Sequence, residues 1–179
     1  MKERLALVAT LALCPTAFAE TELPFSEADA CMNGPVEQFG RYIGDWKIQD
    51  QQLSKDGTEW LPGDGARWIF VCLGNGTAVQ DFWLPADGKV GTNLRTYNPG
   101  TESWDIAWAV DSLPGFAHIQ AQEDDHGNIV MHYKAPLPDP PRRITFFPPD
   151  DKGWKWTLEF MLDGENWTEV YRIRATPYE

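Results

Sequence analysis

Histidine is scarce in this 179-residue chain, which has only three. His126 lies in a turn-forming stretch, whereas His118 and His132 lie in strand-like runs and could face each other on neighbouring strands. That arrangement would suit a metal or a haem, but an isolated strand histidine is more often a hydrogen-bonded structural residue. The Ser–His–Asp, His-Glu-x-x-His and glycine-rich phosphate-loop patterns are also missing. We therefore expect no metal and no cofactor, and the sequence identifies no catalytic residue.

Long apolar runs are missing as well, since a membrane-spanning helix needs about 20 such residues. The apolar stretch 5–13 follows Lys2 and Arg4 and precedes a small-x-small site at Ala17-Phe18-Ala19. This order is typical of a secretory signal peptide. We expect residues 1–19 to be a leader that is removed, and the mature protein to be periplasmic or secreted.

Basic residues are few, with 15 Lys and Arg against 27 Asp and Glu and a formal net charge of −12. Such a surface repels phosphate backbones and anionic lipid heads, which argues against nucleic acid and membrane partners.

Cysteine is equally sparse, and only Cys31 and Cys72 lie beyond the leader. In an oxidising compartment these two could form a single disulfide. Cys72 lies in an apolar run, however, and could instead be a buried free thiol. Neither has the paired spacing of a zinc site.

Short runs of β-branched and aromatic residues, separated by turn signals such as Asp87-Gly88 and Asn98-Pro99-Gly100, fill the rest of the chain. Connections this short join antiparallel strands, and about ten of them predict an all-β, up-and-down barrel. A short helix near residues 35–39 belongs to an N-terminal extension, 20–41, ahead of a barrel domain, 42–179. The predicted strands are 42–53, 66–73, 77–84, 89–97, 102–110, 116–122, 129–134, 142–147, 154–162 and 167–176.

Tryptophan is plentiful, with nine in the chain. In the run 154–162 Trp154, Trp156 and Leu158 share one face, and in 102–110 Trp104 and Trp108 do the same. Each buries a large apolar area, so these faces should point into the barrel. They either fill the barrel or line a cavity within it.

Gly44-Asp45-Trp46 resembles the G-x-W element of the calycin superfamily, which includes lipocalins and fatty-acid-binding proteins. In those barrels the tryptophan closes one end and a late arginine packs over its ring. The resemblance implies that Trp46 is buried at the closed end against Arg172 or Arg174.

Three stretches, FGRYIGDW (39–46), VGTNLRTYNPGTESWDIAW (90–108) and FMLDGENWTEVYRIRA (160–175), resemble an uncharacterised bacterial calycin-like family. That family tends to have L-R-x-Y-D-P in the middle and D-G-G-x-T-W near the end. Here Asn98 replaces the aspartate and Glu165-Asn166 alter the late turn. The family brings no established activity with it.

Arg95 and Tyr97 share a strand face, so their tips can converge on one acidic group. Fatty-acid-binding proteins use an arginine-x-tyrosine pair in this way; alternatively, Arg95 faces solvent and pairs with a surface carboxylate. The next strand, joined by a tight turn, would supply a wall from Trp104 and Trp108. Together with His118 these residues form the candidate ligand-binding set.

Three function classes remain open. The first is an exported binding protein for a small, largely apolar ligand, carrying an acid or a carbonyl, inside the barrel. The second is an isomerase, hydratase or decarboxylase on the same scaffold. The third is a filled barrel that interacts with another envelope protein. A cavity would favour the first two, and catalysis would further need a titratable group with a shifted pKa inside it.

Overall fold

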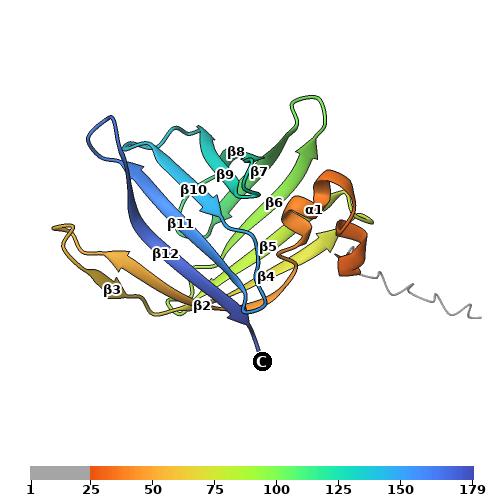
Figure 1. Cartoon of the computed structure of the whole chain (residues 1–179), viewed down its shortest axis with the longest axis horizontal. Coiled ribbons are helices and arrows are strands. Elements are labelled where there is room, and N and C mark those ends of the chain that lie inside the picture. Colours follow the sequence, from red (N-terminus) through yellow and green to blue (C-terminus); the bar gives the residue numbers. More distant parts are fainter. Residues whose placement is uncertain (1–24) are drawn as a thin grey trace, which may run out of the picture.

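A computed structural model describes residues 25–179 (Figure 1). The leader predicted over residues 1–19 lies outside this part. Within residues 25–179, no helix is long and apolar enough to cross a membrane. The elements in chain order are β1 (Phe25–Ser26), the 3-10 helices η1 (Ala28–Cys31) and η2 (Gly34–Val36), α1 (Glu37–Gly40), β2 (Gly44–Leu53), β3 (Trp60–Pro62), β4 (Ala66–Leu73), β5 (Ala78–Pro85), β6 (Gly91–Asn98), β7 (Ser103–Val110), β8 (Ala117–Glu123), β9 (Ile129–Ala135), β10 (Arg142–Phe146), β11 (Trp154–Met161) and β12 (Trp167–Pro177).

Ten of these strands form a closed antiparallel barrel. From β4 to β12 each strand pairs with the next, and β2 closes the ring by pairing with both β12 and β4. The short β1 and β3 extend the edges of β4 and β2. Tight turns between strands place glycine at positive φ, as at Gly88 and Gly127. The predicted all-β barrel with a short N-terminal helix is therefore confirmed, and it is compatible with a calycin-like fold.

The strands alternate in direction, so their connections gather at two ends of the barrel. Figure 1 shows α1 over one end, the closed end, and β3 at the other, the open end. The connections at the closed end are 74–77, 99–102, 124–128 and 147–153. Those at the open end are 54–59, 63–65, 86–90, 111–116, 136–141 and 162–166.

The helix α1 inserts Phe39 into the closed end, where its side chain is fully buried. Its ring packs edge-on against Trp104 and Phe146, with 4.9 and 5.6 Å between ring centroids. Tyr42, which follows the helix, is also fully buried, and the centre of its ring lies 5.3 Å from that of Trp154. These aromatic rings fill the closed half of the interior. Their packing holds α1 in place, although a helix this short would not be stable by itself.

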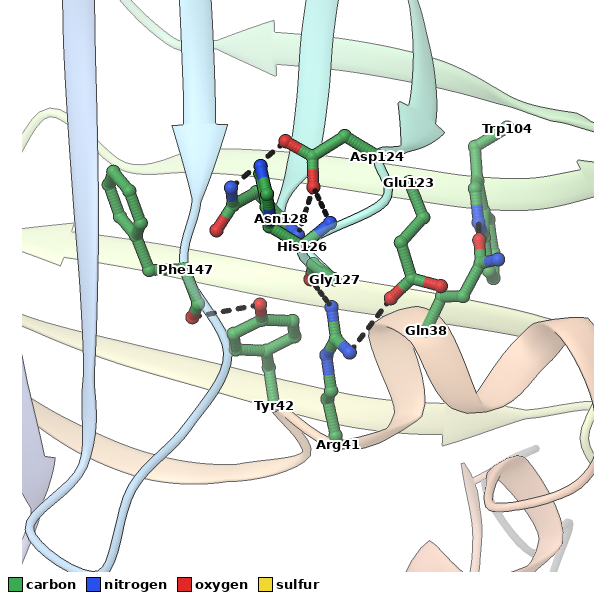
Figure 2. A network of polar contacts seen from close by, with 10 residues as sticks. All are labelled: Gln38, Arg41, Tyr42, Trp104, Glu123, Asp124, His126, Gly127, Asn128 and Phe147. Carbon is green, nitrogen blue, oxygen red and sulfur yellow. Dashed lines mark hydrogen bonds and ion pairs between the residues drawn. The ribbon is translucent and has the colours of Figure 1, made fainter.

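Polar contacts fasten this segment to the turns of the closed end (Figure 2). The Nη2 of Arg41 donates to the carbonyl oxygen of Gly127 at 2.6 Å, and its Nη1 forms an ion pair with Glu123 at 2.8 Å. The Tyr42 hydroxyl donates to the carbonyl oxygen of Phe147 at 3.0 Å. Burial raises the pKa of Tyr42 to about 12, because the phenolate is poorly solvated there.

A disulfide joins Cys31, in η1, to Cys72, in β4. The two Cα atoms lie 5.8 Å apart, within the usual range for a disulfide. The alternative of a free thiol at Cys72 is therefore set aside. The bond ties the N-terminal segment to the barrel wall at the closed end.

Trp46 is placed differently from the expectation drawn from the G-x-W element. It is half-buried, its ring lies 5.8 Å from that of Trp154, and its Nε1–H donates to the carbonyl oxygen of Tyr42 at 2.8 Å. The arginine at the core of the closed end is Arg95, whose guanidinium carbon lies 4.7 Å from the centre of the Phe39 ring. Phe39 and Arg95 thus occupy the role that the resemblance assigned to Trp46 and a late arginine.

The two late arginines lie on the outside of the barrel. Arg172 lies over the ring of Trp60 at 3.8 Å, and Arg174 forms an ion pair with Asp150 at 3.0 Å. Ile173 between them is buried, and successive residues of a strand point to opposite faces. This alternation is the reason that neither arginine reaches Trp46.

Candidate ligand-binding cavity

The open half of the barrel interior contains a cavity of about 320 Å³. Every barrel strand from β4 to β12 contributes inward-facing side chains to its lining. Seven of these side chains are aromatic: Trp68, Trp83, Trp108, Tyr133, Phe146, Trp156 and Tyr171. The others are Asn93, Arg95, Ile119, Met131, Arg142, Ile144, Leu158 and Ile173. The lining is therefore mainly apolar, with few polar groups.

The aromatic walls are held by edge-to-face contacts. Trp68 and Trp83 pack at 5.1 Å and 84°, and Trp156 packs against Tyr171 at 5.9 Å and 85°. On a third side Trp108 lies so close to Gly91 that a Cβ on that glycine would collide with its ring. A larger residue at position 91 would therefore displace this wall of the cavity.

The floor of the cavity is a buried ion pair between Arg95 and Asp81. Both side chains are completely inaccessible to solvent, and Nη2 of Arg95 lies 2.5 Å from Oδ2 of Asp81. Asn93 donates through its side-chain amide to both carboxylate oxygens, each at 3.1 Å. Burial lowers the pKa of Arg95, and the charge of Asp81 opposes that shift. The guanidinium charge is thus compensated within the protein.

No nitrogen of Arg95 forms a well-directed hydrogen bond with any residue of the described chain, despite the short ion-pair contact. The guanidinium is instead surrounded by rings, with Phe39 at 4.7 Å and Phe70 at 5.2 Å. Nε1 of Trp68 also has no hydrogen-bond partner among residues 25–179. Beneath the cavity, Nε and Nη1 of Arg95 and Nε1 of Trp68 are therefore buried N–H donors without a protein acceptor in this part of the chain.

A second arginine, Arg142, lines the cavity from the first position of β10, at the open end. Its guanidinium carbon lies 5.1 Å from the centre of the Phe160 ring, and its buried Nε has no hydrogen-bond partner within residues 25–179. Burial raises the pKa of Tyr133 on the neighbouring strand, and the positive charge of Arg142 partly offsets this rise.

Tyr171 contributes its ring to the wall, and its hydroxyl is engaged by Asp50. The hydroxyl donates to Oδ2 of Asp50 at 2.6 Å, and the backbone N–H of Gly65 donates to Oδ1 of the same carboxylate at 2.9 Å. Burial, together with the hydrogen bond to Asp50, raises the pKa of Tyr171 far above its ordinary value. Tyr171 thus stays a neutral phenol at ordinary pH.

The structure separates the residues that the sequence grouped into one site. Arg95 and Trp108 line the cavity. Trp104 lies below the floor, fully buried, and Tyr97 packs edge-on against it at 5.6 Å. The Nε1–H of Trp104 donates to Oε1 of Gln38 at 2.8 Å, so this tryptophan anchors the N-terminal helix instead of facing a ligand.

His118 lies on the outer face of β8, with a side chain 43% exposed. It contacts Asp105, at 2.8 Å between Nε2 and Oδ1. Ile119 and Ala121 are the inward residues of this strand, so the two-residue period turns His118 outward, where it cannot contribute to the cavity. No group of three or more metal-ligating side chains occurs in the described part of the chain.

The sequence patterns did not reveal four polar residues of the cavity lining: Asn93, Tyr133, Arg142 and Tyr171. A signal for Arg142 was present, because it shares the inward face of its strand with Ile144 and Phe146. Arg143, the next residue, points outward and pairs with Glu159 at 2.6 Å. Because the two arginines are adjacent, only the alternation of their strand tells them apart.

In comparisons with known proteins, no family model matches this chain and no curated protein matches its sequence.

Proposed function

We propose that this protein binds a small, largely apolar ligand inside its barrel. The observation that carries the proposal is the aromatic-walled cavity of about 320 Å³ in the open half of the interior. Ligand pockets typically measure about 300–1,000 Å³ and combine apolar walls with a few placed polar groups. The ligand would be at the small end of that range.

A barrel serving only as an interaction surface would not need this cavity. The closed half is filled by aromatic rings, so the same fold is able to pack solidly where packing is all that is required. The tryptophans of the open half instead leave space between them. We therefore favour binding over the alternative of a filled interaction protein.

The titratable groups of the cavity favour binding over catalysis. A general acid or base works best with a pKa near the operating pH. The pKa values of Tyr133 and Tyr171 are raised, so they lie even further above neutral pH than those of ordinary phenols. Asp81 is held by Arg95 and Asn93. An isomerase, hydratase or decarboxylase on this scaffold would lack a poised proton-transfer group among these residues.

We further propose that the protein acts outside the cytoplasm, in the periplasm or the medium. The leader pattern of residues 1–19 supports this location. The disulfide between Cys31 and Cys72 supports it independently, because such bonds persist mainly in oxidising compartments. The resemblance to a bacterial calycin-like family agrees with both.

Native mass spectrometry of protein purified without detergent from its own cells tests the binding proposal. We expect a bound small molecule that denaturation releases. Ile119→Trp would fill the cavity and abolish the bound mass, whereas Gln122→Trp, on the outer face of the same strand, would retain it. A wild-type protein that carries no such mass and binds no added aromatic compound would refute the proposal.

A further inference from the structure

We propose that the ligand is an organic acid, that Arg142 binds its anionic group at the mouth of the cavity, and that its apolar body extends toward the floor. This inference rests on the proposed binding function and assigns the chemistry and orientation of the ligand. Three observations carry it: the pairing of the arginines, the height of Arg142 in the barrel, and the composition of the floor.

Arg142 has no carboxylate within 4.0 Å, whereas every other arginine of residues 25–179 has one. This is unexpected in a chain with 27 acidic and 15 basic residues. The unpaired arginine is also the one that lines the cavity at its open end. A guanidinium that lines a cavity and stays unpaired amid so many carboxylates is suited to a carboxylate supplied by a ligand.

The guanidinium of Arg142 is held in place without an ionic partner. Its carbon lies 5.1 Å from the centre of the ring of Phe160, the residue opposite it in the β10–β11 pair. A cation–π contact of this kind restrains the side chain and does not occupy its N–H donors. Binding an anion there would cost little side-chain ordering.

Arg142 lies well above the cavity floor. Phe146, four residues further along the same face of β10, contacts the floor, with its ring centre 5.9 Å from the guanidinium carbon of Arg95. Four residues of an extended strand span about 13 Å. A ligand with its acid on Arg142 would therefore have its apolar body among the tryptophans below.

The floor is unsuited to the acid. Arg95 is already neutralised by Asp81, both are fully buried, and an added anion would face the Asp81 carboxylate in a medium that screens charge poorly. The N–H donors left there, on Arg95 and Trp68, are buried, so they present almost no accessible surface to an anionic group. The acid-binding role that the sequence suggested for Arg95 thus passes to Arg142.

The test uses naphthalene-1-acetate and its neutral amide, naphthalene-1-acetamide, two probes of nearly equal shape. Their affinities are measured by quenching of tryptophan fluorescence, with wild-type protein and two variants. Arg142→Gln removes the charge at the mouth. Arg143→Gln is the matched control, because the neighbouring arginine points outward and pairs with Glu159. Near-UV circular dichroism verifies that the variants are folded.

We expect the wild type to bind the acid about tenfold or more tightly than the amide, as a charge-assisted hydrogen bond implies. Arg142→Gln should lower the affinity for the acid by that factor and leave the affinity for the amide unchanged. Arg143→Gln should change neither affinity. If the wild type binds both probes equally, or if Arg142→Gln keeps the preference, this inference is wrong while the proposed function stands. If the wild type binds neither probe, this inference is wrong, and the proposed function fails with it when native mass spectrometry also finds no bound molecule. The wild-type preference is decisive even should Arg142→Gln not fold.

Discussion

Inside the closed end of the barrel, Arg95 is fully buried against Asp81, whereas inside the open end Arg142 has no carboxylate partner in the described chain. The aromatic residues differ in the same way. Trp104 has no exposed surface and helps to fill the core, while Trp108 is half-buried beside a cavity. The comparison indicates that one half of the interior supplies stability, which allows the other half to stay incompletely filled and available for a ligand.

The largest effect is expected from breaking the ion pair of the closed half. Asp81→Ala leaves a buried, uncompensated guanidinium, so it should lower the free energy of unfolding by about 3–5 kcal/mol. This loss is measured by urea unfolding, with tryptophan fluorescence as the signal. Glu159→Ala, which breaks a partly exposed pair on the outside, should cost about 1 kcal/mol or less. Equal losses for the two variants would contradict the structural role assigned to the floor.

Removing the disulfide should have the next largest effect. The double variant Cys31→Ala/Cys72→Ala frees a loop with a sequence separation of 41, and the expected loss is about 4 kcal/mol. A reductant added to the wild type should reproduce the loss in the same urea titration. Because the bond lies at the closed end, the folded variant should still bind naphthalene-1-acetamide as the wild type does. Loss of that binding would show that the two halves are not independent.

A high-pH experiment probes Tyr42 in the closed half. Its pKa rises from 10.0 to about 12 on folding, so the folded state holds the proton more tightly. This stability is fully present below the unfolded pKa and is lost as pH rises through the folded pKa. The expected loss is about 2–3 kcal/mol, since one pKa unit corresponds to about 1.4 kcal/mol.

The measurement for Tyr42 is the free energy of unfolding from about pH 9 to about pH 12, in wild type and in Tyr42→Phe. The variant lacks the titrating group but keeps Tyr133 and Tyr171, whose pKa values are also raised. The difference between the two curves therefore isolates Tyr42. Parallel curves would mean that this phenol is not desolvated in the folded protein.

The smallest change in stability is expected at the open end. Trp108→Ala should cost only about 1 kcal/mol, since the side chain is half-buried and faces a cavity. The same variant should lower the affinity for naphthalene-1-acetamide about tenfold, because a large apolar contact is lost. Trp167→Ala, whose ring stacks with Arg143 outside the barrel, should leave the affinity unchanged. A reversed pattern would place the ligand outside the barrel.

Much of the barrel was predictable from local patterns. Alternation placed Trp154, Trp156 and Leu158 on one face of a strand, and all three do point inward. The pattern did not reveal that Trp154 fills the closed half while the other two line the cavity. Alternation specifies the face of a strand, whereas height along the barrel depends on the stagger between strands.

The candidate site was predictable in part. Arg95 and Trp108 could be placed near each other because a tight turn joins their strands. His118 could not be placed without knowing that Ile119 faces inward. The resemblance to calycins placed a tryptophan and a late arginine at the closed end, but that position is taken by Phe39 and Arg95, which come from separate segments.

By itself, then, the sequence determined the all-β class, the up-and-down order of the strands and the excess of inward aromatic residues, because a period of two and glycine-rich turns act over a few neighbouring residues. Only the tertiary structure decided which half of the barrel is filled and which arginine is left unpaired. The physical reason is that compensation of a buried charge depends on distance in space. Arg95, on β6, meets Asp81 on the neighbouring strand β5, while Arg142, at the rim, has no carboxylate of residues 25–179 within 4.0 Å.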